Sequence, residues 1–151
     1  MSDVEKKIVI NATPEQTYNV LMDFPSYPEW NPMVLSIDGD TSPSSTLTVS
    51  IKVGARAPQS FKPTVLKNEV NREFRWVGKL LLACLYRGEH YFIIEGNSEG
   101  GCTFVHGERF SGVLSSPLNN MMGEDLPKAF EAFNNALKER VEKQDASAVS
   151  S

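Results

Sequence analysis

Two histidines and a glutamate lie close together in the second half of the chain, and all three side chains exchange protons. They are His90, His106 and Glu108, and the chain has no other histidine. A carboxylate beside an imidazole orients the ring and stabilises its protonated form. Such a pair works as a general acid or base near neutral pH. These residue types therefore indicate acid–base chemistry, provided that the fold brings them together.

A glycine-rich turn at residues 96–101 separates the two segments, 86–95 and 102–113, that carry these residues. Both segments are rich in aromatic and β-branched residues, so we predict two antiparallel strands joined as a hairpin. This hairpin pairs His90 with Glu108 and Phe92 with His106. Because side chains alternate between faces, both histidines and Glu108 share a face with most of the aromatic rings. The other face carries most of the charges, so we predict that the histidine face points inward.

Three interpretations of this group stay open. As catalysts, a base among them would remove an α-proton from a polyketide-like carbonyl chain for aldol closure, and an acid would help a hydroxyl leave as water. As ligand contacts, they would fix a hydroxyl or carboxylate without breaking a bond. As a structural pair, they would only satisfy each other, because a buried charge needs a partner. Two histidines and a carboxylate also suit zinc or iron, but no stronger metal motif is present, so we predict neither a metal nor a cofactor.

The elements that must position these residues begin with a strand at Val4–Ile10. Thr13 then suits a helix N-cap, Pro14 the first helical position, and Gln16 the third, where it completes a capping box. We expect this helix to run to about residue 22. Three prolines in the segment 23–32 forbid a long helix there, because each fixes φ and removes a donor. Two short helices are therefore predicted between the first and second strands.

After residue 32 the sequence changes to strand-forming segments, which we place at 33–38, 46–53, 61–70, 73–80, 86–95 and 102–113. With the first strand they predict a seven-stranded curved antiparallel sheet. The last element is a long helix, because apolar residues recur at helical spacing from Leu126 to Val141. Pro127 lies inside this pattern, so we expect a kink or a restart there. The fold class is α+β, with one domain at 1–144 and a disordered tail at 145–151.

A sheet that curves around one helix encloses a space that side chains rarely fill, and we predict that it holds a hydrophobic small molecule. The predicted ligand-binding residues come from the inward face of the sheet, the helical turn before residue 32 and the C-terminal helix. They are Trp30, Trp76, Phe92, Phe104, Phe110, Met122, Leu126 and Phe130.

Composition excludes several classes of protein. The formal net charge is −4 and no basic block is present, so nucleic acid is not the expected partner. The apolar stretch at 80–85 is too short to span a bilayer, and the N-terminus lacks the pattern of a secretory signal. Cys84 and Cys102 lack metal-ligand spacing and read as reduced thiols. We therefore expect a cytoplasmic protein, monomeric or homodimeric, that does not insert into membranes.

The order of these elements, and above all the segment Asp-Phe-Pro-Ser-Tyr-Pro-Glu-Trp-Asn-Pro at 23–32, resembles the polyketide cyclase/dehydrase-like branch of the SRPBCC superfamily. Residues 76–78, 88–92 and 101–112 are also similar to that branch, and the resemblance covers about residues 4–142. It implies the helix-grip fold shared by START lipid-transfer domains and birch-pollen-allergen-like proteins.

That superfamily includes binders, lipid carriers, aromatase/cyclases and small hydrolases, so activity must be argued from the site. We expect a biosynthetic protein of lyase type that cyclises, dehydrates or otherwise rearranges a polyketide-like or aromatic molecule without a cofactor. The alternative is a non-catalytic carrier of a lipid or hydrophobic metabolite.

Overall fold

The computed structural model describes residues 3–79 and 85–150 of the chain, and side chains as far as residue 144. Its elements follow the predicted order. They are β1 (Val4–Ile10), α1 (Pro14–Met22), the 3₁₀ turn η1 (Phe24–Ser26), α2 (Tyr27–Trp30), β2 (Val34–Asp38), β3 (Thr48–Ile51), β4 (Gln59–Phe61), β5 (Thr64–Glu69), β6 (Glu73–Lys79), β7 (Arg87–Gly96), β8 (Cys102–Ser111), α3 (Ser115–Met122) and α4 (Asp125–Ser150).

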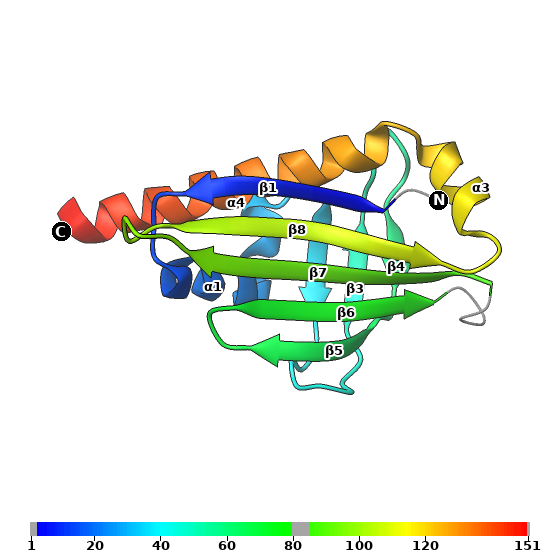
Figure 1. Cartoon of the computed structure of the whole chain (residues 1–151), viewed down its shortest axis with the longest axis horizontal. Helices are drawn as coiled ribbons and strands as arrows, with labels where there is room; N and C mark the ends of the chain where they lie inside the picture. The colour runs from blue at the N-terminus through cyan, green and yellow to red at the C-terminus, as the bar shows by residue number, and fades with distance from the viewer. Residues whose placement is uncertain (1–2, 80–84, 151) are drawn as a thin grey trace.

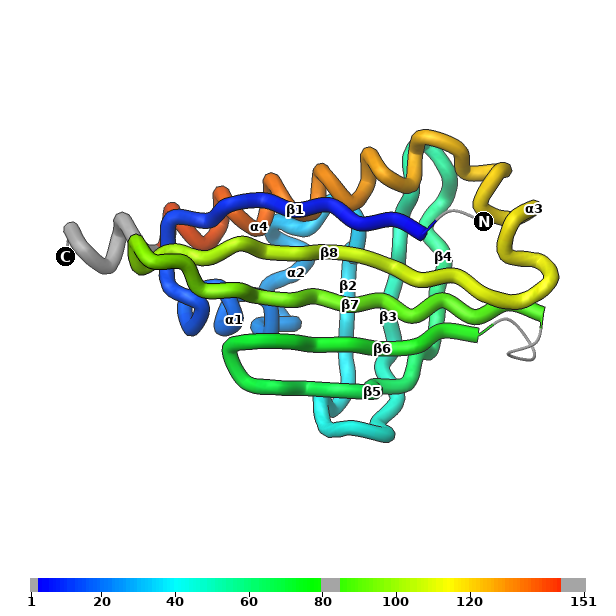
Figure 2. The backbone as a smooth tube through the Cα atoms, viewed as in Figure 1, coloured from blue at the N-terminus to red at the C-terminus, as the bar shows by residue number. Residues whose placement is uncertain are grey.

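The strands form two antiparallel sheets, of order β1-β8-β7-β6-β5 and β2-β3-β4. Figure 1 shows that the strands of the smaller sheet run crosswise behind the larger one, while α4 lies along β1. The tube in Figure 2 follows the chain from β4 into β5, where it turns from one sheet into the other. The predicted α+β fold, with an antiparallel sheet and a long C-terminal helix, is confirmed.

The prediction of seven strands in one sheet needs a correction, and Pro63 supplies the reason. The predicted strand at 61–70 is divided, because β4 ends at Phe61 and β5 begins at Thr64. A proline has no N–H for a strand ladder, so pairing stops there. The two sheets stay joined at this corner, where Thr46 bridges Thr64 and the Leu47 N–H donates to the Pro63 carbonyl at 2.9 Å. Together they form one bent surface.

The helical predictions are confirmed at both ends of the chain. The capping box forms, with Thr13 Oγ1 accepting from the Gln16 N–H at 3.1 Å and Gln16 Oε1 accepting from the Thr13 N–H at 2.8 Å. The restart near Pro127 is also present, because α3 ends at Met122 and α4 begins at Asp125. The bounds of α4 include residues 145–150, and the domain boundary at 144 stays a prediction.

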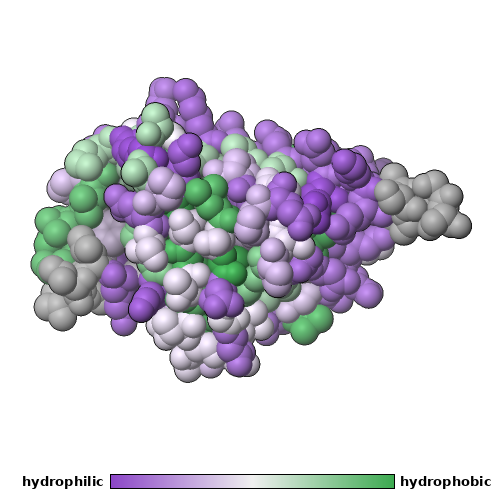
Figure 3. Space-filling model, turned by 180° about the vertical axis from the view of Figure 1, so that it is seen from behind, coloured by the Kyte–Doolittle hydropathy of each residue, from purple (hydrophilic) through white to green (hydrophobic). Residues whose placement is uncertain are grey.

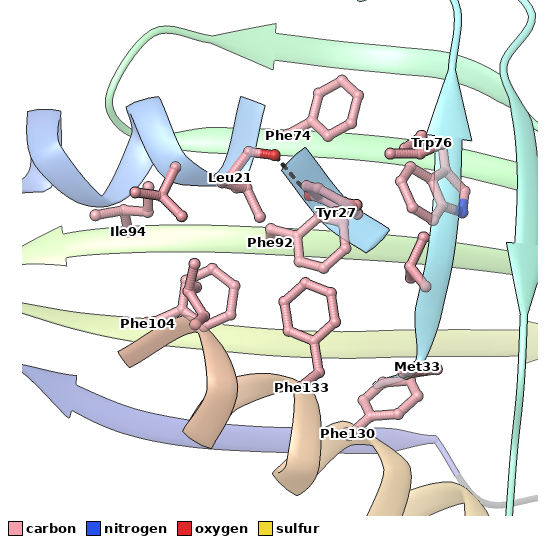
Figure 4. Close-up of a cluster of buried hydrophobic side chains, with 14 of the residues drawn as sticks. Leu21, Tyr27, Met33, Phe74, Trp76, Phe92, Ile94, Phe104, Phe130 and Phe133 are labelled. Carbon is pink, nitrogen blue, oxygen red and sulfur yellow. Dashed lines mark hydrogen bonds between the residues drawn. The ribbon is translucent and has the colours of Figure 1, made fainter. Parts of the chain in front are cut away.

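The core lies between the larger sheet and α4 and is built largely of aromatic rings. Phe133 of α4 stacks on Phe92 and Phe104, with ring centroids 5.4 and 6.1 Å apart. Figure 4 shows Phe130 and Phe133 pointing from α4 toward the sheet. It also shows Tyr27, whose hydroxyl donates to the Leu21 carbonyl at 2.5 Å and fixes the aromatic segment on α1.

Candidate active and ligand-binding site

The predicted hairpin places the three chemical residues side by side. In the register of β7 and β8, His90 is opposite Glu108 and Phe92 is opposite His106, as predicted. Both histidines are fully buried, and their Nε2 atoms lie 2.6 Å apart. Glu108 Oε1 lies 3.6 Å from His90 Nδ1, and the Glu108 side chain is 17% exposed. At 3.6 Å this is a contact rather than a hydrogen bond.

A fourth polar residue, Asn134 of α4, completes the group. It is buried, and its Oδ1 lies 3.1 Å from His106 Nδ1 while its Nδ2 donates to the Lys6 carbonyl at 3.1 Å. Asn134 is not among the site residues predicted from the sequence. The available signal was its position, because a polar residue lies four positions after Phe130 on the apolar stripe of the helix. A polar side chain at a core position calls for a partner.

These contacts fix which nitrogen carries each proton. A carbonyl only accepts, so Asn134 presents its amide nitrogen to Lys6 and its oxygen to His106. His106 must then donate through Nδ1, which leaves its Nε2 as an acceptor in the neutral ring. His90 therefore donates through Nε2, and its Nδ1 keeps a free lone pair directed at Glu108. The hydrogen bonds form one directed series from His90 through His106 and Asn134 to the Lys6 carbonyl of β1, and the Glu108 carboxyl group lies in contact with its His90 end.

Burial sets the protonation states of the same residues. It lowers the pKa of His90 to about 3 and raises the pKa of Glu108 to about 8. Burial also holds the pKa of His106 well below its usual value, and neighbouring His90 lowers it further, although hydrogen bonds to Asn134 and to the Phe130 backbone act in the opposite direction. Near neutral pH both rings are therefore neutral and Glu108 carries a proton. This corrects the expected pair of a carboxylate and a protonated imidazole, since the cost of burying charge outweighs their mutual attraction.

Aromatic rings surround this series of hydrogen-bonded residues. Phe130 stacks on His106 with ring centroids 4.1 Å apart and an interplanar angle of 13°, and Trp76 lies 5.0 Å from His90. The ring centroids of Phe110 and Tyr86 are 6.0 Å apart, close to Glu108. Burial and the nearby Glu108 both raise the pKa of the Tyr86 hydroxyl, so Tyr86 stays protonated. The site is therefore apolar apart from a few neutral hydrogen-bonding groups.

The structure gives the other predicted ligand-binding residues different surroundings. Phe92 and Phe104 stack on each other and on Phe133, and the ring centroids of Trp30 and Phe133 are 5.8 Å apart. Phe130 stacks on His90 and His106 instead. Leu126 is buried and Met122 half-buried where α3 meets α4. Their roles in binding stay predictions.

Two surface hollows border α4 away from this series of hydrogen-bonded residues. One, of about 240 Å³, lies between the start of β1 and the α3–α4 junction and includes Leu126. The other, of about 260 Å³, is lined by residues that include Pro32, Lys52 and Asp125. Neither hollow includes His90, His106 or Glu108 in its lining.

On the face drawn in Figure 3, hydrophobic side chains are gathered at the end that carries α3 and near the middle, and hydrophilic ones predominate elsewhere. Val113 and Met121 are among the exposed apolar residues at that end. None of the helices in the described part of the chain is long and apolar enough to cross a bilayer. Within the same residues, no three side chains of the metal-binding types are grouped to hold an ion, and the Nε2 atoms of His90 and His106 face each other. Cys102 is buried, and Cys84 lies outside the described residues.

Comparisons with known proteins give a family and a fold. A family model described as polyketide cyclase / dehydrase and lipid transport matches residues 1–142. The Zhui aromatase/cyclase from Streptomyces sp. R1128 is 11% identical, with a TM-score of 0.76 over 95% of this chain and 94% of that one. A START superfamily protein from Mycobacterium smegmatis is 17% identical, with a TM-score of 0.70 over 94% of this chain and 98% of that one. These low identities show the fold alone, and they confirm the predicted helix-grip architecture. No curated protein sequence matches the chain.

Proposed function

Since the chain belongs to the polyketide cyclase / dehydrase and lipid transport family, we propose that it binds a hydrophobic, polyketide-like or aromatic molecule and transforms it by acid–base chemistry that needs no cofactor. One observation carries the proposal. The carboxyl group of the largely buried Glu108 lies 3.6 Å from Nδ1 of the fully buried His90, among aromatic rings, where burial raises the pKa of the carboxyl group and lowers that of the imidazole. Paired acid and base groups of this kind suit cyclisation, dehydration and related rearrangements.

A dehydration shows how the two groups would cooperate. Glu108 gives its proton to the hydroxyl of a β-hydroxy ketone, which leaves as water, while His90 Nδ1 takes the α-proton and the carbon–carbon double bond forms. Loss of the proton turns Glu108 into a carboxylate 3.6 Å from His90. That new charge raises the pKa of the imidazole at the step in which the ring must accept a proton. A proton then returns from His90 to Glu108 and restores both groups.

His106 and Asn134 would act through His90 rather than on the substrate. They hold the Nε2 hydrogen of His90 in place, so its Nδ1 stays unprotonated and directed at Glu108. The surrounding aromatic rings, among them Trp76 and Phe130, would exclude water from the reacting group. These are positioning roles, and their loss is expected to lower the rate without changing which atoms react.

The test is dehydration of 4-hydroxy-4-phenylbutan-2-one to the conjugated enone, followed by absorbance. We expect Glu108→Gln and His90→Ala each to lower the rate by at least about 100-fold, the usual effect of losing a general acid or base. Arg109→Gln, an exposed neighbour on the outer face of β8, is the matched control. Wild-type rates in both site variants would remove the enzymatic proposal.

A non-catalytic carrier of a lipid or hydrophobic metabolite is the second candidate, and the aromatic rings around the site favour it. It predicts that a hydrophobic ligand co-purifies with the protein and raises its melting temperature by mass action. Mass spectrometry of the purified protein would identify that ligand. Binding that survives Glu108→Gln, with no turnover in either protein, would establish this function instead. The cytoplasmic location and the monomeric or homodimeric state stay predictions.

A further inference from the structure

Two glycines face each other across neighbouring strands beside the site. Gly78 of β6 is the register partner of Gly88 of β7, and both lie on the inward face that carries Trp76 and His90. Neither has a positive φ, so the backbone conformation does not require glycine. Glycine inside a strand weakens it, and it often marks a place where another group approaches the backbone. We therefore attribute glycine at these two positions to the room that the missing side chain leaves over the backbone.

The two glycines provide space for different groups. A side-chain carbon at Gly88 would collide with Glu108 Oε2, so Gly88 makes room for the acid of the site. A side-chain carbon at Gly78 would meet no atom within 4 Å. Space is thus open over the backbone of β6, near the carboxyl group, and none of the described side chains occupies the Cβ position at Gly78.

The described residues of β6, β7 and β8 that face this space are mostly apolar, and none of them carries a positive charge. Trp76 lies two residues earlier on the same face of β6, and Phe110 is the register partner of Gly88. The cations of these strands lie on the opposite face, where Arg75 and Arg87 bind Glu89 at 2.7 and 3.2 Å. Of the described inward residues on β6, β7 and β8, Glu108 alone is acidic and none is Lys or Arg.

We propose that the open space over Gly78 is the subsite for the flat ring of an uncharged aromatic ligand, whose hydroxyl or carbonyl oxygen lies at the Glu108 carboxyl group. The inference rests on the proposed function and adds the place and the class of ligand. A bare glycine backbone admits a ring closely, and the Trp76 and Phe110 rings offer it apolar edges. An anionic ligand would lie beside a carboxyl group with no cation to pair with, which is costly in an apolar site.

The experiment uses protein labelled with [¹⁵N]glycine and two probes of matched shape, 2-naphthol and 2-naphthoate. We expect 2-naphthol to shift the amide signals of Gly78 and Gly88, while those of the distant turn glycines Gly39 and Gly100 stay in place. The charged 2-naphthoate is expected to bind at least 10-fold more weakly. Gly78→Val should weaken 2-naphthol binding at least 10-fold, and Gly78→Ala by less, because each fills part of the same space.

The matched control is Lys79→Val, which puts the same side chain on the exposed, opposite face of β6 and should leave binding unchanged. Valine suits a strand and meets open space at position 78, so Gly78→Val should melt no lower than the parent protein. Unmoved Gly78 signals, unchanged affinity in Gly78→Val, equal binding of both probes, or binding of neither would each overturn the subsite. Turnover of the β-hydroxy ketone that depends on Glu108 would in those cases leave the proposed function standing.

Discussion

The pKa of a glutamate is shifted in opposite directions on the two faces of the larger sheet. On the outer face, burial alone would raise the pKa of Glu73, but hydrogen bonds from Arg75 and Lys67 bring it below its usual value. On the inner face Glu108 has no cation, and burial raises its pKa to about 8. Strand alternation decides the difference, because it gives one carboxyl group two basic neighbours and the other a neutral imidazole. The sheet thus separates a charged face from a face of neutral acid and base.

The largest effect should come from breaking the inner network at Asn134. Asn134→Ala removes the partner of the part-buried Lys6 carbonyl and of the buried His106 N–H, and a buried group left unpaired costs about 1–3 kcal/mol. We expect a loss of about 2–5 kcal/mol in the free energy of unfolding, measured with urea. Asn135→Ala, at the next and exposed helical position, should change stability by less than about 0.5 kcal/mol. A loss as small in Asn134→Ala would mean that the network does not hold the core.

The protonation of Glu108 should appear as a decline of stability with rising pH. Its pKa is about 8 in the folded protein and near its ordinary value when unfolded, so between those values the folded state binds the extra proton. Stability then falls as pH rises toward 8, by at most about 1.4 kcal/mol per pH unit for one proton. Urea unfolding between pH 6 and pH 8 should show this slope in the parent protein and not in Glu108→Gln. Parallel curves would mean that Glu108 is ionised.

His90 should give the opposite slope at lower pH. Burial lowers its pKa from 6.5 to about 3. At pH values between these two, the unfolded state binds a proton at this histidine and the folded state does not. Stability therefore falls as pH drops from about 6.5 toward 3. His90→Gln should flatten that part of the curve relative to the parent protein. A histidine that titrates by NMR near pH 6.5 at position 90 would contradict this.

The smallest effect is expected on the outer face. Glu89→Gln removes the ion pairs with Arg75 and Arg87, whose side chains are partly solvent-exposed. Pairs of this kind contribute about 0–1 kcal/mol and weaken with salt. We expect a loss below about 1 kcal/mol at low salt that disappears in 1 M NaCl. A larger, salt-independent loss would show that the two faces are less different than their surroundings indicate.

What the sequence could predict was decided by local rules. The capping box of Thr13 and Gln16 and the pairing of His90 with Glu108 follow from helix-start residues, a glycine turn and strand alternation, all within a short stretch of chain. The split at Pro63 was also local but overlooked, because the proline lies inside a strand-like segment.

The rest of the site depends on contacts between distant residues. Asn134 of α4 contacts His106 of β8, and the local sequence around these two residues does not predict the contact. The neutral state of Glu108 likewise depends on which cations the folded sheet leaves on its far side. Side-chain packing decides whether the interior is open or closed, and periodicity alone does not reveal it.

The tie between Lys6 and Asn134 has a consequence for how the protein is made. During synthesis β1 leaves the ribosome before its strand partner β8, and the Asn134 side chain follows Lys6 by 128 residues. The ring nitrogen that carries the proton in each histidine is therefore fixed only when α4 packs against β1. A nascent or truncated chain would have both histidines and Glu108 but no fixed acid and base, so the chemistry becomes available only in the completed protein.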